Sequence, residues 1–271
     1  MTPAPGADWE LVTLGRSAAS VRRSPDGLTY AKTASGEPAA SALAAERDRL
    51  VWLAGTPVAA PRVADWDARD GACTLVTSAV PGVPASALPA ADAPAAIRQL
   101  VAYLTFLHAL PVGDCPFDHR LRTTVTAAAA NVAAGHVDKP DVDEPDVDEP
   151  DVDEPDVDES RRGRSAAGRL DRLVAGRSRA EALEPGDLAV CHGDFCLPNV
   201  LLDPDILAVT GIVDVGHLGV ADRHLDIALL TRSAASPVNP GYGPGLAARA
   251  IAESGADPWR IEYYRLLDEF F

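Results

Sequence analysis

Long apolar runs are absent from this sequence. Although 47% of its 271 residues are hydrophobic, no stretch approaches the roughly 18 consecutive apolar residues of a membrane-spanning helix. Residues 1–12 also lack the basic stretch and the apolar segment of a secretion signal. We therefore expect a soluble, cytoplasmic protein with no membrane partner, long enough for one or two domains with a large buried core.

Cysteine is scarce as well. The four cysteines are Cys73, Cys115, Cys191 and Cys196. Only Cys191 and Cys196 lie close together, and their separation is not the C-x-x-C spacing of zinc or redox sites. We therefore expect reduced, structural thiols, with neither a disulfide framework nor a zinc site.

Basic residues are too few to balance the acidic ones. The chain has 24 Lys and Arg against 40 Asp and Glu, which gives a formal net charge of −16. Residues 141–159 carry twelve carboxylates and no basic residue, so removing them from −16 leaves only −4 for the rest. Nucleic acid is not expected as a partner, because phosphate backbones select basic surfaces.

Those twelve carboxylates belong to a repeat, four copies of a five-residue DVDEP-type unit inside an acidic insertion at 138–160. Proline breaks helices, like charges repel, and each unit offers only one apolar side chain, so we expect a solvated, extended loop that is dispensable for chemistry. A cation-attracting tether is the alternative, although the unit lacks the glycine and terminal glutamate spacing of an EF-hand loop.

The patterns of the first 80 residues predict a small, sheet-rich lobe. Short strand-like runs are separated by turn residues, and one interval, 39–55, has apolar residues at helical spacing that include Leu43, Leu50 and Val51. The expected strands are 9–14, 20–23, 28–33 and 72–80.

The rest of the chain predicts a larger, mainly helical lobe. Residues 81–94 are rich in Pro and Ala and are interpreted as a hinge and connector, after which 95–271 form the second lobe. A pair of strands around 190–216 interrupts the helices. The fold class expected is α+β. The expected helices are 95–110, 124–135, 165–176, 221–233, 244–255 and 258–271.

Three polar side chains stand among Val, Leu and Ile in residues 190–216, which read VCHGDFCLPNVLLDPDILAVTGIVDVG. They are Asp194, Asn199 and Asp214. An unpaired charge in a buried strand costs several kcal/mol, so these carboxylates need compensation. A divalent metal with a phosphate is the leading candidate.

The spacing of these residues suits phosphoryl transfer. Asp194 and Asn199 follow a tight turn and can converge, and a strand then ends at Asp214. The reaction needs a carboxylate that orients the acceptor hydroxyl and accepts its proton, plus an amide and a second carboxylate that hold Mg²⁺ on the nucleotide phosphates. The order matches the catalytic loop of protein kinases, with His192-Gly193-Asp194 in place of His-Arg-Asp.

This interpretation predicts an upstream lysine on a strand and a glutamate on the following helix. Lys32 and Glu46 meet both expectations. Alone, Lys32 would be a solvated strand lysine and Glu46 an exposed helix charge. Together they can contact the α and β phosphates and hold the ammonium in position. We assign His192 a structural role.

The chain resembles the aminoglycoside phosphotransferase family, whose fold is protein-kinase-like. The resemblance covers nearly the whole length except the acidic repeat and rests on YAKT, ERDRLVWL, CHGDxCxPNxxxDP, TGxxDxGxxGxADRxxDxAL and LLDEFF. It implies that Asp194 is the catalytic aspartate and that Asn199 and Asp214 bind Mg²⁺. It also implies that Lys32 and Glu46 position the triphosphate of ATP.

The same resemblance assigns two further nucleotide contacts. Residues 14–21, with Ser17 at the tip, would be the phosphate-covering loop, although a single glycine makes an ordinary hairpin turn the alternative. Ser78 to Val80 would be the hinge that binds adenine through main-chain hydrogen bonds. Because main-chain groups specify only an edge, a nucleotide other than ATP stays open.

The family's substrates are polycations, so the resemblance implies an acidic acceptor pocket. Candidates besides Asp194 are Asp222, Asp268, Glu269 and the terminal carboxylate of Phe271. Asp226 is interpreted as a structural residue that caps a helix or braces the catalytic loop, and Asp222 is left undecided between the two roles.

Two branches of the family compete as the nearest resemblance. The longer shared stretches favour the branch that phosphorylates the 3''-hydroxyl of streptomycin, whereas the ending LLDEFF is similar to the 3'-phosphotransferases of kanamycin and neomycin. A kinase of choline, homoserine or a macrolide, or a non-catalytic nucleotide-binding module, remains an alternative. We expect a monomer.

One residue departs from the family pattern. His217 stands where relatives commonly carry arginine in D-x-G-R. Arginine is always charged, whereas histidine is mostly neutral near pH 7, so any contact with phosphate or a neighbouring carboxylate should be weaker. We expect modest or pH-dependent turnover.

Overall fold

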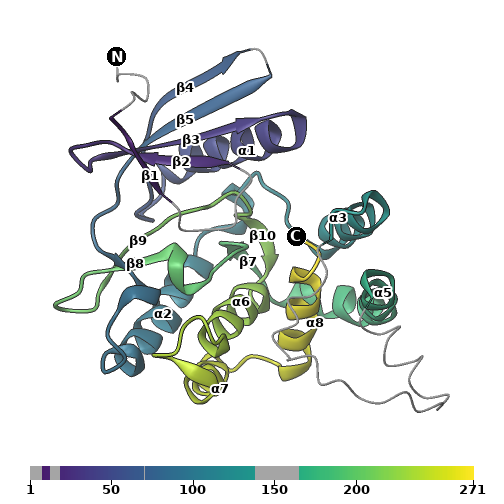
Figure 1. Ribbon diagram of the computed structural model, residues 1–271. Helices are drawn as coiled ribbons and strands as arrows, with labels where there is room; N and C mark the ends of the chain where they lie inside the picture. The colour runs from purple at the N-terminus through teal and green to yellow at the C-terminus, as the bar shows by residue number, and fades with distance from the viewer. Residues whose placement is uncertain (1–7, 13–18, 70, 138–164) are drawn as a thin grey trace, which may run out of the picture.

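A computed structural model describes residues 8–12, 19–69, 71–137 and 165–271 of the chain. The N-terminal part is a five-stranded antiparallel sheet in the order β1-β2-β3-β5-β4, with helix α1 packed against it (Figure 1). The central strand of this sheet is β3. The elements of this part are β1 (Glu10–Val12), β2 (Ser20–Arg23), β3 (Thr29–Ser35), α1 (Glu37–Leu53), β4 (Val63–Arg69) and β5 (Ala72–Ser78).

Helix α1 begins where the chain turns sharply away from β3. Gly36 adopts a φ of 82°, which glycine tolerates, and a proline stands in the first turn of the helix. The buried face carries Leu43, Glu46 and Leu50. Val51, which the periodicity assigned to the same face, is 60% exposed, because it stands one position beyond Leu50 and points about 100° away.

Strand β4 was not predicted. Its sequence, VADWDAR, is largely polar, and all of its residues are exposed or half-buried. Among the described residues it is an edge strand that pairs with β5 alone, so it needs no apolar face on its outer side. An edge strand of this composition lacks the alternation on which sequence prediction depends.

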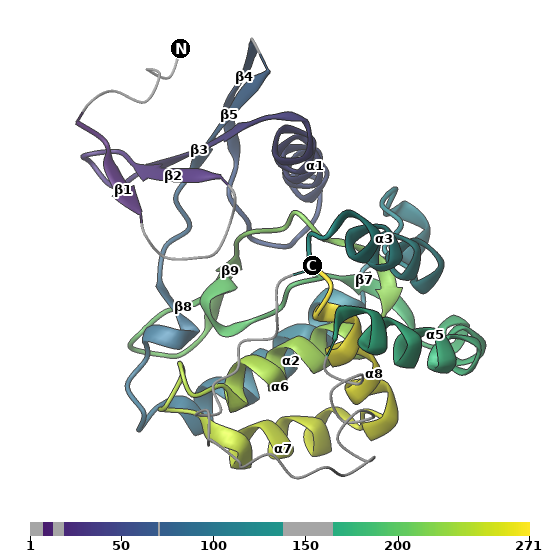
Figure 2. The ribbon, with the colours of Figure 1, turned by 45° about the vertical axis from the view of Figure 1, so that its right-hand side comes forward.

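The remaining chain is mainly helical, and two small sheets lie between its helices and the five-stranded sheet (Figure 2). One sheet pairs β7 with β10, and the other has the order β6-β8-β9. The α+β fold class is confirmed. The elements are β6 (Val83–Pro84), α2 (Ala93–His108), α3 (Leu121–Ala134), α5 (Ala166–Leu183), β7 (Leu188–Cys191), β8 (Val200–Leu202), β9 (Val209–Ile212), β10 (Gly219–Asp222), α6 (His224–Ala235), α7 (Gly243–Ser254) and α8 (Pro258–Asp268).

The strands around the polar motif pair differently from the expectation. β7 and β9, which flank it, are not partners: β7 pairs antiparallel with β10, and β9 with β8. The stretch predicted as a helix from residue 221 begins as the end of β10, and α6 starts only at His224. Both differences arise from long-range pairing, which local patterns do not encode.

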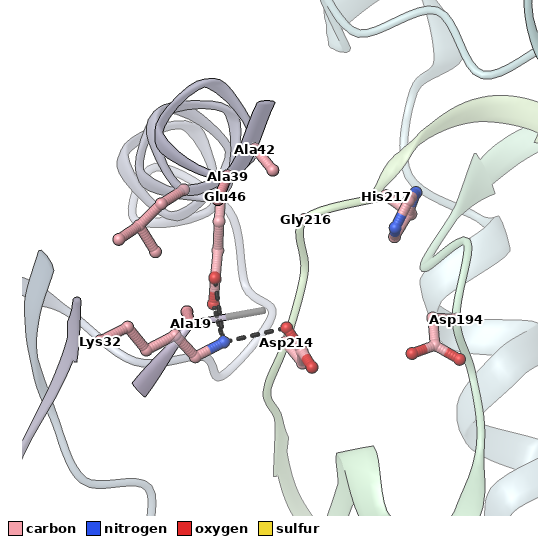
Figure 3. Close-up of a pocket in the computed structure, with 10 residues that line it drawn as sticks. Ala19, Lys32, Ala39, Ala42, Glu46, Asp194, Asp214, Gly216 and His217 are labelled. Carbon is pink, nitrogen blue, oxygen red and sulfur yellow. Dashed lines mark hydrogen bonds and ion pairs between the residues drawn. The ribbon is translucent and has the colours of Figure 1, made fainter. Parts of the chain in front are cut away.

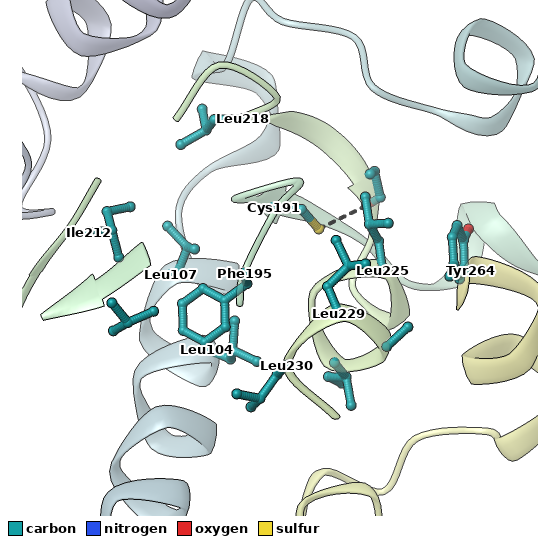
Figure 4. Packing of buried hydrophobic residues seen from close by; sticks show 14 of the residues in the cluster. Leu104, Leu107, Cys191, Phe195, Ile212, Leu218, Leu225, Leu229, Leu230 and Tyr264 are labelled. Carbon is teal, nitrogen blue, oxygen red and sulfur yellow. Dashed lines mark hydrogen bonds between the residues drawn. The ribbon is translucent and has the colours of Figure 1, made fainter. Parts of the chain in front are cut away.

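The part of the main hydrophobic core that lies under the small sheets is formed between α2 and α6 (Figure 4). Leu104 and Leu107 from α2 meet Leu230 from α6 and Ile212 from β9 in this core. Phe195 is fully buried in the same cluster, so the chain immediately after Asp194 is anchored. The loop that carries Asp194 is therefore supported by a well-packed hydrophobic core.

The cysteines are present as thiols in the structure. All four cysteines are free, and Cys73, Cys115 and Cys191 are buried. Burial raises the pKa of the Cys191 thiol well above its usual value, which suits a structural role. In the part of the chain that the structure describes, no helix combines the length and apolarity needed to cross a bilayer.

The two faces of α1 give a direct test of this packing. Leu50→Ala removes a side chain that is 2% exposed and should lower the free energy of unfolding by about 2–5 kcal/mol. Val51→Ala, one position along, should change it by less than about 0.5 kcal/mol. Urea unfolding measures both, and equal losses would contradict the assigned buried face.

Candidate active site

Lys32 lines a pocket between the two parts of the chain, and its ammonium binds acidic side chains from both parts (Figure 3). Lys32 lies on the central strand β3 and donates to Glu46 of α1, with Nζ 2.7 Å from Oε1 and 2.9 Å from Oε2. Burial favours the neutral amine, but the charges of Glu46 and Asp214 together raise the pKa of Lys32. The side chain is therefore a cation.

Asp214 joins this pair from the other side. Lys32 Nζ also donates to Asp214 Oδ1 over 2.9 Å, so one ammonium links β3, α1 and the segment after β9. Burial alone would raise the pKa of Asp214, but the charge of Lys32 holds it below the usual value. Asp214 has a φ of 58°, a conformation that non-glycine residues seldom adopt.

The loop that carries Asp194 follows β7 and is hydrogen-bonded to the same segment. His192 Nδ1 accepts a hydrogen bond from the Asp194 main-chain N–H (3.2 Å), and His192 Nε2 donates to the carbonyl of Val213 (3.0 Å). These roles require a neutral imidazole with its proton on Nε2. His192 therefore acts as the structural residue that was expected, holding Asp194 in register with Asp214.

Asn199 lies beside Asp194. Its Nδ2 donates to the Asp194 carbonyl (3.0 Å) and to Asp194 Oδ2 (2.8 Å). Asn199 is 8% exposed, and its main-chain carbonyl accepts from Val213 N–H (2.9 Å). The sequence spacing between Asp194 and Asn199 thus brings the two side chains together as predicted.

Asp226 braces the loop from below. It is fully buried at the start of α6, where it accepts the main-chain N–H groups of His192 and Gly193, each at 2.9 Å. His108 Nε2 lies 2.9 Å from the same carboxylate. Burial would raise the pKa of Asp226, but the hydrogen bond and charge of His108 lower it. This is the bracing role expected for Asp226.

Together these groups line a cavity of about 520 Å³. Asp194 and Asp214 face it from the helical part, and Lys32 and Glu46 from the sheet part (Figure 3). Small side chains on α1 leave room for a ligand. The lining residues are Ala19, Lys32, Ala39, Ala42, Leu43, Glu46, Asp194, Asp214, Gly216 and His217.

The donor set fits a hard divalent cation. The amide of Asn199 uses its nitrogen on Asp194, which leaves its carbonyl oxygen as an acceptor. Asp214 uses Oδ1 on Lys32 and retains Oδ2. Amide and carboxylate oxygens are the ligands that Mg²⁺ takes alongside water and phosphate. The residues present therefore suit a Mg²⁺-nucleotide complex.

The expected hinge, Ser78 to Val80, has a main-chain N–H that is available to a ligand. Ser78 ends β5 and donates its N–H to the carbonyl of Arg62, and Ala79 N–H donates to the carbonyl of Leu28. The N–H of Val80 has no hydrogen bond with any residue that the structure describes, so it can meet the edge of a base. Ser17 and the acidic insertion 138–160 lie outside the described residues.

The C-terminal segment reaches the rim of this pocket. The carbonyl of Phe270 accepts from Asn131 Nδ2 of α3 over 2.8 Å. Figures 1 and 2 both show the C-terminus beside α3, near the junction of the two parts. The ring of Phe271 packs edge-on against His217, with centroids 6.3 Å apart.

Both acidic residues of the segment have arginine partners. Asp268 pairs with Arg232 of α6, and Glu269 pairs with Arg169 of α5 over 3.1 Å. Burial raises the pKa of Asp268 to about 6. The positive charge of Arg232 lowers this pKa in part, and the negative charge of Asp194 raises it further. Asp268 is thus close enough to Asp194 for the two charges to interact.

Asp222 does not belong to this site. It is fully buried, and its Oδ1 accepts from the N–H (3.0 Å) and Nδ1 (2.6 Å) of His224. Its Oδ2 accepts from Arg260 of α8 over 3.1 Å. The expectation that Asp222 contacts substrate is wrong, because it is enclosed between β10, α6 and α8 and holds them together.

His217 and a second histidine form a neutral pair beside Asp194. The rings of His119 and His217 meet edge to face with centroids 5.7 Å apart. Burial lowers the pKa of His217 and lowers that of His119 to about 4, so both are neutral near pH 7. The neutral imidazole expected at position 217 fits this environment. Sequence reasoning missed His119, which carries no motif.

Gly193 allows the catalytic loop and the segment after Asp214 to touch. It has a φ of 82°, and a Cβ built on it would stand 2.3 Å from the carbonyl oxygen of His217. A real Cβ contact is never that short, so any side chain at 193 must push the two loops apart. The glycine in His-Gly-Asp is therefore required by this packing.

We expect Gly193→Ala to lower turnover in a phosphoryl-transfer assay by about 10²-fold, because Asp194 and Asp214 would move out of register. Gly255→Ala is the matched control: Gly255 ends α7 with a φ of 63° and has nothing within 4 Å of the added methyl group. It carries the same backbone strain without the clash. Equal activity of the two variants would contradict the required contact.

The chain matches known proteins over nearly its whole length. A family model described as "Phosphotransferase enzyme family" covers residues 8–263. The streptomycin 3''-kinase of Streptomyces griseus is 41% identical over 266 residues, 97% of this chain and 92% of the relative. An aminoglycoside 3'-phosphotransferase of Streptomyces fradiae is also 41% identical, over 278 residues, 98% of this chain and 96% of the relative.

Solved structures agree with these matches. Aminoglycoside phosphotransferase APH(3'')-Id of Streptomyces rimosus, in complex with ADP and streptomycin, superposes with a TM-score of 0.81 at 33% identity, covering 97% of this chain and 92% of that one. An aminoglycoside-3'-phosphotransferase of type VIII gives 0.77 at 38% identity, covering 98% and 95%. The chain therefore belongs to the phosphotransferase enzyme family, as an O-phosphotransferase with the kinase-like fold of the aminoglycoside phosphotransferases.

Proposed function

We propose that this protein transfers the γ-phosphoryl group of ATP, with Mg²⁺, to a hydroxyl group of an aminoglycoside, and that its preferred acceptor is the 3''-hydroxyl of streptomycin. The observation that carries the proposal is the convergence of Asp194 and Asp214 with the Lys32–Glu46 pair on one pocket, with Asn199 hydrogen-bonded to Asp194 behind it. Few functions other than phosphoryl transfer from a metal-bound nucleotide need all five groups together.

Asp194 is proposed to orient the acceptor hydroxyl and to accept its proton. Asn199 Nδ2 holds Oδ2, which fixes the carboxylate and leaves Oδ1 for the hydroxyl. The hydroxyl oxygen then bonds to the γ-phosphorus as the bond to the β-γ bridging oxygen breaks and ADP leaves. The transfer is direct, so no covalent phosphoenzyme forms.

Lys32 is proposed to neutralise the α and β phosphates. Glu46 keeps its ammonium in position through two hydrogen bonds, and the bond to Asp214 is exchanged for phosphate oxygens when nucleotide enters. Asn199 and Asp214 would hold Mg²⁺, which when bound supplies further neutralisation of the phosphates. Val80 N–H and the main chain of Ser78 would receive the adenine edge.

Negative charge at the pocket rim suits a cationic acceptor. Asp268 and Glu269 lie on the C-terminal segment, whose Phe271 ring packs against His217, and each carboxylate is partly offset by its arginine partner. Asp194 adds a further charge inside. A polycation would be attracted to this group of carboxylates before it makes any specific contact.

Streptomycin is preferred over the 3'-hydroxyl substrates because of the longer stretches of similar sequence. The likeness to APH(3'')-Id, whose complex holds ADP and streptomycin, supports this choice. The second candidate is 3'-phosphorylation of kanamycin-type aminoglycosides. It is favoured by the LLDEFF ending at the pocket rim and by the equal identity to the Streptomyces fradiae enzyme.

The first test is ATP consumption with Mg²⁺ in the presence of streptomycin, kanamycin or neomycin. We expect turnover on streptomycin, abolition by EDTA, and a fall of about 10²–10⁴-fold in Asp194→Asn, because the proton acceptor is lost. Asp205→Asn, an exposed aspartate in the loop between β8 and β9, is the control and should keep full activity.

Each outcome of this assay decides between substrates. Turnover only on kanamycin or neomycin would replace streptomycin by the second candidate. Absence of turnover on all three would overturn the aminoglycoside proposal. Full activity of Asp194→Asn would remove Asp194 from the mechanism.

A pH dependence follows from Asp268. Its pKa is raised to about 6, so its carboxylate is charged above that pH and neutral below it. If it attracts a cationic acceptor, KM for the aminoglycoside should increase as the pH falls from about 7.5 to about 5.5, while KM for ATP changes less. In Asp268→Asn the acceptor KM should be higher at neutral pH and should lose this dependence. An unchanged KM profile in the variant would exclude Asp268 from acceptor binding.

A further inference from the structure

Helix α1 makes two side-chain connections within a single turn, one to strand β3 and one to the turn after Asp214. Glu46 and Arg49 stand three residues apart, so their side chains lie on neighbouring positions of the helix. Glu46 accepts from Lys32, whereas Arg49 Nε donates to the carbonyl of Leu218 over 2.6 Å. Arg49 Nη1 also donates to the carbonyl of Ala45 over 3.0 Å, which directs the guanidinium along the helix.

The carbonyl that Arg49 contacts belongs to the segment that carries Asp214. Leu218 is fully buried, and its N–H donates to the carbonyl of Val215 over 3.0 Å, so the segment forms a tight turn directly after Asp214. A Cβ built on Gly216 would stand 3.9 Å from the Cβ of Glu46, which shows that α1 lies in contact with this turn. Figure 3 shows Gly216 between Glu46 and His217.

These bonds close a ring. Asp214 accepts from Lys32, Lys32 donates to Glu46, one turn of α1 leads to Arg49, and Arg49 donates to Leu218, from which the chain returns to Asp214. Every link is a charged hydrogen bond or a short covalent segment. The position of Glu46 relative to Asp214 is thereby fixed from both ends of the helical turn.

A second contact supports the guanidinium. Arg49 lies over the ring of Phe117, with its Cζ 4.8 Å from the centroid. Trp52, three residues further along α1, meets the same ring edge-on at 6.1 Å and donates Nε1 to the carbonyl of Asp114 over 2.9 Å. Burial lowers the pKa of Arg49, as expected for a guanidinium partly withdrawn from water.

We infer that Arg49 is a positioning residue for phosphoryl transfer, which holds α1 on the turn after Asp214 so that Glu46 keeps Lys32 aligned with the phosphates. The inference rests on the proposed roles of Lys32, Glu46 and Asp214. Arginine suits the position because its planar fork can donate to two carbonyls and stack on an aromatic ring at once, whereas lysine offers a single point charge. Arg49 itself touches no reacting atom.

Arg49→Met tests the inference, because it keeps much of the length and apolar stem while removing every donor. We expect kcat to fall about 10- to 100-fold, with little change in KM for the aminoglycoside. Arg47→Met is the matched control on the same helix: Arg47 contacts Asp48 and the ring of Trp66, both in the sheet part, and this variant should keep its kcat.

A double-mutant cycle separates positioning from general loss of structure. If Arg49 acts through Glu46, Arg49→Met should lower kcat by less than about twofold in a Glu46→Gln background. The inference would be overturned if Arg49→Met lowered kcat by the same factor in both backgrounds. It would also be overturned if Arg49→Met lowered kcat of the wild-type protein by less than about twofold. Thermal unfolding shows whether Arg49→Met folds. If it does not, Arg49→Lys, a milder change that keeps the charge, replaces it in the same double-mutant cycle.

The cycle can be followed without an aminoglycoside. If wild-type protein turns over none of the three antibiotics, the proposed function fails, but slow hydrolysis of Mg²⁺-ATP by water still reports the alignment of the nucleotide. The inference is supported independently if Arg49→Met loses this hydrolysis and Arg47→Met keeps it. The loss in Arg49→Met should again be smaller in the Glu46→Gln background. Equal hydrolysis in Arg49→Met and wild type rejects it.

Discussion

One partly buried ammonium, that of Lys32, links the two parts of this protein. Lys32 comes from the central strand of the sheet part, and its partners Glu46 and Asp214 come from α1 and from the segment after β9. Glu46 is buried and Lys32 is partly buried, so each charge is stabilised by its neighbours and their positions depend on one another. The attraction between these opposite charges therefore holds the site in place, and the three side chains line the pocket.

The apolar surroundings of Asp194, Asn199 and Asp214 raised the question of what offsets their charge, and metal was the first answer. The protein supplies part of the compensation itself. Lys32 offsets Asp214, and Asn199 donates to Asp194. The fourth polar group, Asp226, takes two main-chain N–H groups and His108, so it stabilises the loop without facing the pocket. A metal-nucleotide complex would meet a site whose charges are already arranged.

Order and spacing along the chain predicted which polar residues lie together at the pocket. Lys32, Glu46 and the catalytic-loop residues follow one another at distances that phosphoryl transfer requires, and the strands and helices that carry them have clear periodicity. What could not be predicted depends on contacts between distant segments. The burial of Asp222, the pairing of β7 with β10 and the meeting of His119 with His217 leave no local pattern. The polar edge strand β4 was missed because an edge needs no apolar face.

The approach of Gly193 to the carbonyl of His217 has a consequence for how such a sequence can diverge. The backbone of the loop after Asp214 occupies the volume that a side chain at 193 would need, so the two positions cannot change independently. The arginine that protein kinases carry at the place of Gly193 could be accepted only after that loop had moved back. Substitutions at the two loops should therefore be epistatic: each is harmful alone and acceptable only in the presence of the other.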